Sequence, residues 1–149
     1  MRAQDIMTSN PFVLARHELV SRAAEAMRDR DIGLVPIVDD VLSMHLIGVI
    51  TDRDIAVRCV ASRHDSECTV GDHMTGNRLG TVHPDDDLDA ILSVMESNQV
   101  RRVPVVVEGN RVVGMIAQAD IARRVGPESP EKIEAVLERV STPHELAML

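Results

Sequence analysis

Gly48-Val-Ile-Thr-Asp-Arg-Asp54 and Gly114-Met-Ile-Ala-Gln-Ala-Asp120 are two versions of one segment, in which a short apolar strand leads directly into a helix. The glycine and the aspartate are six positions apart in both versions, and Ile-Ala follows the aspartate in both. A recurrence of residue types at fixed spacing indicates an internal duplication, and this duplication decides the fold.

The segments before this motif repeat in the same order. Asp5-Ile-Met-Thr8 recurs as Asp72-His-Met-Thr75, and the apolar-proline pairs Val35-Pro36 and Val103-Pro104 occupy matching places. The proline lies twelve residues before the glycine in the first copy and ten before it in the second. This difference falls between two expected strands, where a hairpin loop tolerates a change of length.

Each copy has the pattern of a β-α-β-β-α repeat. Apolar residues in 19–27 and 88–95 share one helical face, and the second of these helices is expected to start around Pro84-Asp85-Asp86. The β-rich runs are 34–38, 46–50, 103–107 and 111–116, and further helices begin near Asp52 and Gln118. Short helical segments are expected around 4–7 and 70–74.

One such repeat is too small to bury both faces of its sheet, so the two copies are expected to pack sheet against sheet. The predicted fold is α/β (α+β), with repeat 1 in residues 1–65 and repeat 2 in residues 66–125. Residues 126–149 form a C-terminal extension with a helix over about 130–140, whose apolar face is Ile133, Val136, Leu137 and Val140.

Composition excludes several classes of protein. The formal charge of −8 with scattered arginines and one aromatic residue, Phe12, disfavours nucleic acid as a partner. No apolar run reaches the ~20 residues of a membrane span, and the N-terminus lacks a signal peptide, so a cytoplasmic protein is expected. Cys59 and Cys68 are too few for a disulfide framework, and a redox role for them is left open.

Because of its apolar-proline strand and its strand-to-helix motif, each copy resembles a CBS domain, and the pair resembles a Bateman module. The resemblance spans about residues 1–125 and extends to CBS-pair proteins of the actinobacterial hypoxic-response type. It implies clefts between the repeats that bind AMP, ADP, ATP or S-adenosylmethionine as a regulatory ligand. It also implies a homodimer and an effector protein as partners.

The resemblance places ligand contacts at matching positions of both repeats. An aspartate in the first helical turn can accept hydrogen bonds from ribose hydroxyls, and a threonine at the helix start can bind phosphate. Ala117 replaces that threonine in the second repeat, so one competent and one weak or vacant site are expected. Arg101 and Arg102 could compensate for the lost hydroxyl with their charge, or they could form a solvated strand edge. Aliphatic side chains such as Val13, Ile37 and Ile50 are expected to sandwich the base. The implied ligand-binding residues are Val13, Val35, Pro36, Thr51, Arg53, Asp54, Pro104 and Asp120.

Other interpretations of these residues stay open. Thr51 and Asp54 could simply end a strand and support a helix. The segment His83-Pro-Asp-Asp-Asp87 could hold a metal, although a helix start with solvated acids explains it better. The remaining histidines are expected at the surface or in loops. No motif joins a nucleophile to a base, so no enzyme, catalytic residue, metal site or obligatory cofactor is predicted. The predicted function is a regulatory adenine-nucleotide sensor, and the alternative is a ligand-free structural or interaction protein that has lost nucleotide binding.

Overall fold

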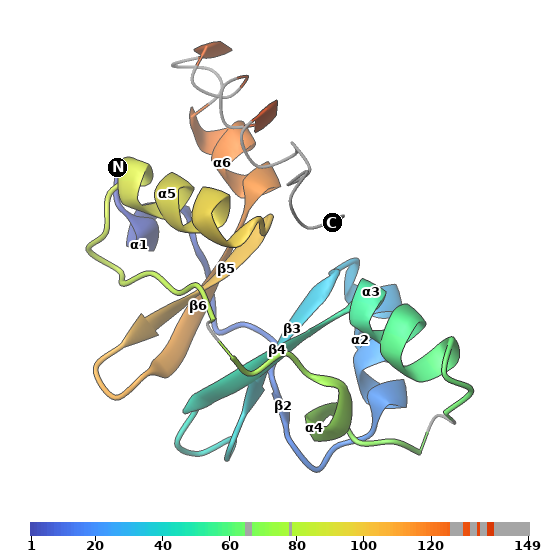
Figure 1. The fold of residues 1–149 in the computed structure, drawn as a ribbon. Helices are drawn as coiled ribbons and strands as arrows, with labels where there is room; N and C mark the ends of the chain where they lie inside the picture. The colour runs from blue at the N-terminus through green and yellow to red at the C-terminus, as the bar shows by residue number, and fades with distance from the viewer. Residues whose placement is uncertain (65–66, 78, 126–129, 132–133, 135–136, 139–149) are drawn as a thin grey trace. The chain divides into compact units, whose positions relative to one another are not determined.

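The computed structural model describes residues 1–64, 67–77, 79–125, 130, 131, 134, 137 and 138. The described residues form two compact units that interleave along the chain. Unit 1 consists of Met1–Ser9, Gly80–Val106 and the described residues from Val113 onward, and unit 2 consists of the described residues of Asn10–Leu79 together with Val107–Val112. Figure 1 shows the elements of both.

Unit 2 is built on a sheet of order β2-β3-β4, in which β2 is parallel and β4 antiparallel to β3. The central strand β3 is buried along its whole length, and β4 alternates buried with half-buried residues because one of its faces covers the core. The elements are β2 (Leu14–Ala15), α2 (Val20–Arg30), β3 (Leu34–Val38), β4 (Leu46–Thr51), α3 (Asp52–Asp54), the π-helix η1 (Ile55–Val60) and α4 (Val70–His73).

Unit 1 has a sheet of order β1-β6-β5, in which β1 pairs antiparallel with β6. Its core is aliphatic, with Ile91, Met95 and Ile116 fully buried. The loop between β5 and β6 turns through Gly109 and Asn110, both at positive φ, and its tip is hydrogen-bonded within unit 2. The elements are α1 (Ala3–Ile6), β1 (Thr8–Ser9), α5 (Leu88–Asn98), β5 (Arg102–Val107), β6 (Arg111–Ala117) and α6 (Gln118–Val125).

The two Asp-x-Met-Thr motifs each pack on the sheet of the other repeat. Met7 and Thr8 lie against Gly114 of β6, while Met74 and Thr75 lie against Gly48 of β4. A Cβ atom on Gly48 would lie 2.6 Å from Met74 Sδ, and one on Gly114 would lie 2.5 Å from Met7 Sδ. The repeated glycines therefore leave room for the repeated methionines, and this exchange makes the compact units differ from the sequence repeats 1–65 and 66–125.

The two small sheets with their helices confirm the predicted α/β (α+β) class. Two details differ from expectation: α5 begins at Leu88 with Asp87 as its cap, and the helix after Asp54 is a π-helix. The capping carboxylate of Asp87 accepts a hydrogen bond from the backbone of Ala90 at 2.8 Å, which fixes the start later than the proline suggested. Ile133, Val136 and Val140 of the predicted C-terminal helix lie outside the described residues, whereas Leu137 is helical and 42% exposed.

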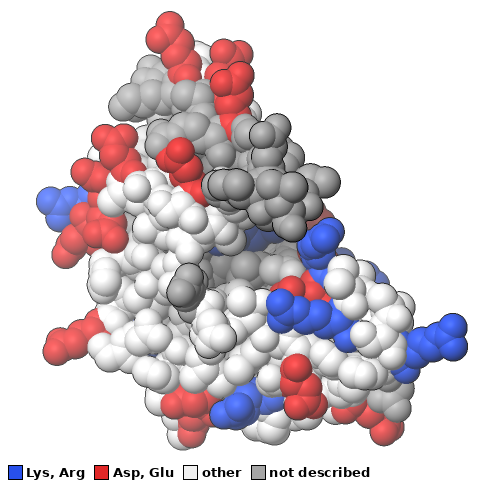
Figure 2. All heavy atoms as spheres, in the orientation of Figure 1, with Lys and Arg blue, Asp and Glu red and all other residues white. Residues whose placement is uncertain are grey.

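The surface of unit 1 is acidic around the start of α5. Asp85, Asp87 and Asp89 are exposed there, and Figure 2 shows acidic side chains gathered over the region of α1 and α5. Such a surface repels nucleic acid phosphates, in keeping with the net charge of −8. Among the described residues, no helix combines the length and the apolar character that crossing a bilayer would require.

Candidate functional site

Thr51 and Asp54 form a reciprocal pair at the junction of β4 and α3. The Thr51 hydroxyl accepts a hydrogen bond from the Asp54 amide at 3.0 Å, and the Asp54 carboxylate accepts one from the Thr51 amide at 3.0 Å. This capping box satisfies two backbone donors at the helix start. The interpretation that these two residues cap the helix is therefore correct for the local structure. The capping box also holds both side chains in one fixed geometry.

The capping box engages only one oxygen of the Asp54 carboxylate. Oδ2 is bound to the Thr51 amide, while Oδ1 lies 3.9 Å from Nε of Arg58 in an ion pair, and the Asp54 side chain is 16% exposed. A carboxylate oxygen with an open lone pair can accept a hydroxyl hydrogen bond. Arg53 is exposed on the same turn.

The junction of β6 and α6 keeps half of this arrangement. The Asp120 carboxylate accepts a hydrogen bond from the Ala117 amide at 2.9 Å, as Asp54 does from Thr51. The Asp120 amide has no hydroxyl acceptor at position 117, because that residue is alanine. The second oxygen of Asp120 is bound by the Arg123 guanidinium, so both carboxylate oxygens have protein partners.

A pocket of about 310 Å³ opens beside Asp120 within unit 1. Its lining residues are Ile6, Thr8, Asp120, Arg123 and Arg124. Two arginines against one carboxylate leave a positive balance, which suits an anionic group such as phosphate. Thr8, Arg123 and Arg124 are not among the ligand-binding residues predicted from the sequence. The available signals were that Thr8 belongs to a repeated motif and that the arginines follow Asp120 by about one helical turn.

The strand residues expected to face the ligand are mostly buried. Val35 and Ile37 are 0% exposed, Pro36 and Pro104 are buried as well, and Val13 is half-buried. Ile37 and Ile50 belong to the hydrophobic core of unit 2. Both side chains help to fill that core, and their contact with a base stays a prediction.

The structure places the remaining polar candidates at separate positions. Arg101 and Arg102 are exposed, as expected of a solvated strand edge. In the His83 segment, Asp86 accepts a hydrogen bond from the His83 amide at 2.8 Å and Asp87 caps α5, which favours the helix start over a metal site. His73, expected at the surface or in a loop, lies instead in α4 and is only 7% exposed.

Replacing Ala117 by threonine is expected to stabilise unit 1. The new hydroxyl would accept from the Asp120 amide and complete the capping box, which is worth about 0.5–2 kcal/mol at such positions. Urea denaturation of Ala117→Thr measures the gain, and Thr51→Ala is the matched reverse change, with a loss of similar size. A destabilised Ala117→Thr together with an unaffected Thr51→Ala would contradict the capping geometry.

Comparison with known proteins identifies a family match over most of the chain. The CBS domain profile matches residues 3–60 and again residues 70–126. Hypoxic response protein 1 of Mycobacterium tuberculosis is 37% identical over 123 residues, covering 83% of this chain and 84% of the relative. The CBS domain-containing protein YhcV of Bacillus subtilis is 30% identical over 138 residues, covering 93% and 94%.

Solved structures give the same result. The crystal structure of Hypoxic Response Protein I with two coordinated zinc ions is 38% identical with a TM-score of 0.75, covering 83% of this chain and 98% of that one. The CBS domain pair of protein MJ0100, in complex with 5'-methylthioadenosine and S-adenosyl-L-methionine, is 30% identical with a TM-score of 0.75, covering 86% and 98%.

Proposed function

Because the chain belongs to the CBS domain family and carries two copies of the domain, we propose that it is a regulatory module that binds AMP, ADP, ATP or S-adenosylmethionine. The ligand would bind at the strand-to-helix junctions and change how the protein meets an effector in the cytoplasm. The module would form a homodimer and would carry out no chemistry of its own.

The observation that carries this proposal is the Asp54 carboxylate, whose Oδ2 is held by the Thr51 amide and whose Oδ1 has only a 3.9 Å ion pair with Arg58. The capping box fixes the carboxylate before any ligand arrives, so little entropy is lost when a ribose hydroxyl binds. The complex of the MJ0100 domain pair with two adenosine derivatives supports this class of ligand. All four proposed ligands contain adenosine, so each carries the ribose hydroxyls that the Asp54 carboxylate would bind.

The pocket beside Asp120 is proposed as a second and different site. Arg123 and Arg124 would supply the phosphate contact that Ala117 cannot make, although Arg123 must release Asp120 before the carboxylate can accept from ribose. This pocket therefore favours the phosphorylated ligands over S-adenosylmethionine, which carries no phosphate. The two junctions would then differ in ligand preference.

Signalling would pass through an apolar surface on η1. Val57 and Val60 are 51% and 66% exposed there, directly after the helix start that carries Asp54. Exposed valines on a helix suit contact with a second protein surface. We propose that this surface contributes to the homodimer or to the effector interface.

A thermal-shift screen with AMP, ADP, ATP, S-adenosylmethionine and, as a control, GMP tests the proposed function. A true ligand present at 100 times its dissociation constant adds about 2.7 kcal/mol to the free energy of unfolding, which raises Tm measurably. At least one adenine ligand should raise Tm more than GMP does. Absence of any shift at millimolar ligand would favour the ligand-free interaction protein.

A further inference from the structure

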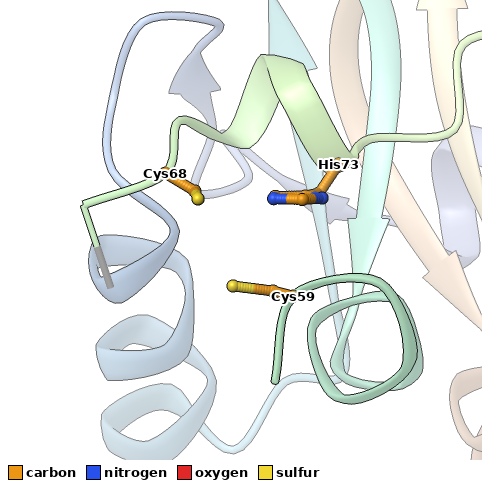
Figure 3. A group of neighbouring side chains, drawn as sticks. All are labelled: Cys59, Cys68 and His73. Atoms are coloured by element: carbon orange, nitrogen blue, oxygen red, sulfur yellow. The ribbon is translucent and has the colours of Figure 1, made fainter. Parts of the chain in front are cut away.

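Three side chains that can bind metal converge in unit 2, away from the Asp54 junction. The sulfur atoms of Cys59 and Cys68 and a ring nitrogen of His73 all lie within 4.8 Å of one another. Figure 3 shows the Cys68 sulfur directed toward the His73 ring, with the Cys59 sulfur near both. Cys59 is 3% exposed and His73 is 7% exposed, so these two side chains are shielded from water, while Cys68 is half-buried.

Each of these three residues lies in a different segment and is held by a backbone hydrogen bond. Cys59 lies in η1, and its carbonyl accepts a hydrogen bond from the His64 amide at 2.9 Å. The Cys68 carbonyl accepts from the Val20 amide at 2.8 Å. His73 is the last residue of α4, and its carbonyl accepts from the Arg58 side chain at 3.2 Å. Ligands that converge from separate, anchored segments are typical of a structural metal site.

His64 supplies a fourth group at the edge of this cluster. Its Nδ1 lies 3.3 Å from Nε2 of His73. Two imidazole nitrogens bound to one tetrahedral zinc, each at ~2.0–2.1 Å, are separated by about 3.3–3.4 Å. The spacing of the two rings is therefore already that of two ligands on one ion. The His64 amide donates to the Cys59 carbonyl at 2.9 Å, which holds the His64 backbone next to Cys59.

We propose that Cys59, Cys68, His73 and His64 bind one Zn²⁺ as a tetrahedral Cys2His2 site. Both thiols would lose their protons to solvent, and two thiolates with two neutral imidazoles would balance the charge of the ion. Thiolate and imidazole together select zinc over magnesium or calcium, which prefer oxygen ligands. The ion would tie the end of η1 to α4 within unit 2. None of its ligands belongs to the Asp54 or Asp120 junctions, while Arg58 contacts both the His73 carbonyl and the Asp54 carboxylate.

Cobalt substitution tests the proposal directly. The full chain without an affinity tag is reduced, stripped of metal with a chelator and titrated with Co²⁺, and Zn²⁺ is then added as a competitor. The site predicts visible d–d absorption of tetrahedral Co²⁺ with a thiolate-to-cobalt charge-transfer band, saturating at one equivalent. Zn²⁺ should abolish both bands and raise Tm.

The variants separate this site from adventitious binding. Cys68→Ser and His64→Ala alter half-buried and exposed residues, so the fold should survive, which circular dichroism checks. Each should weaken zinc binding at least ~100-fold, since loss of an outer-shell partner alone costs 10–100-fold. His17→Ala, an exposed histidine of the same unit, should bind like the unaltered chain.

Three results would overturn the proposal. The first is a cobalt spectrum without the thiolate band, and the second is a Cys68→Ser variant that binds zinc as tightly as His17→Ala. The third is a reduced chain that binds no zinc but forms a Cys59–Cys68 disulfide when it is oxidised. A loss in Cys68→Ser without a loss in His64→Ala would overturn the four-ligand assignment.

Discussion

Replacement of Asp54 by alanine is expected to weaken binding of the adenine ligand about 100-fold or more. Hydrogen bonds to a charged group contribute about 1.5–3 kcal/mol each, and the carboxylate would accept from two ribose hydroxyls. A loss of at least ~3 kcal/mol corresponds to a factor of about 100 in the dissociation constant. Isothermal titration calorimetry with the ligand found by thermal shift measures the change.

The neighbouring acid provides the matched control for this prediction. Asp52 is exposed on the same helical turn and its carboxylate accepts from the Arg53 amide at 2.8 Å, so Asp52→Ala changes the charge by the same amount. Asp52→Ala should bind the ligand nearly as well as the unaltered chain. Equal losses in both variants would show that general electrostatics, and not the Asp54 contact, carries the binding.

Replacement of Gly48 by alanine is expected to destabilise unit 2 by about 1–3 kcal/mol, the usual cost of overpacking. The new methyl group would lie 2.6 Å from Met74 Sδ and 3.0 Å from the Thr75 carbonyl oxygen. That carbonyl accepts from the Val49 amide at 3.0 Å, so the segment cannot move away without breaking a strand contact. The clash should exceed the ~0.4–1 kcal/mol that a Gly→Ala change gains through the unfolded chain.

A double-mutant cycle with Met74→Ala isolates the cause of this loss. If the methionine side chain is what the methyl group meets, Gly48→Ala should cost at least ~1 kcal/mol less in the Met74→Ala background. Urea denaturation of the four proteins gives the coupling energy. Additive losses would show that the packing of Met74 on Gly48 does not explain the repeated glycine.

The sequence allowed the duplication, the strand positions and the strand-to-helix junctions to be predicted, because spacing between repeated residues reports local backbone structure. It did not predict that Met7 and Met74 each pack on the other repeat's sheet, since a repeated motif does not say which copy it contacts. Burial of Ile37 and Ile50 in the core of unit 2 also depends on the folded sheet, and their contact with a base stays a prediction.

The cluster at Cys59 escaped prediction for a related reason. Cys59, His64, Cys68 and His73 have none of the short spacings typical of zinc motifs, and they converge only because η1 and α4 lie side by side. The pocket beside Asp120 was likewise underestimated, because Arg123 and Arg124 lie outside the strand-to-helix motif itself. Local motifs reveal the junctions, while contacts between separate elements require the fold.

The most direct test of ligand binding at the Asp54 junction is a two-dimensional ¹H–¹⁵N NMR titration of the full chain with the stabilising adenine ligand. Ribose binding at Asp54 would perturb the hydrogen bonds of the Thr51 and Asp54 amides, so these two signals should shift in proportion to occupancy. The Asp52→Ala variant should show the same shifts, and Asp54→Ala should show none there. Saturating ligand that leaves the Thr51 and Asp54 signals in place would contradict the proposed nucleotide site.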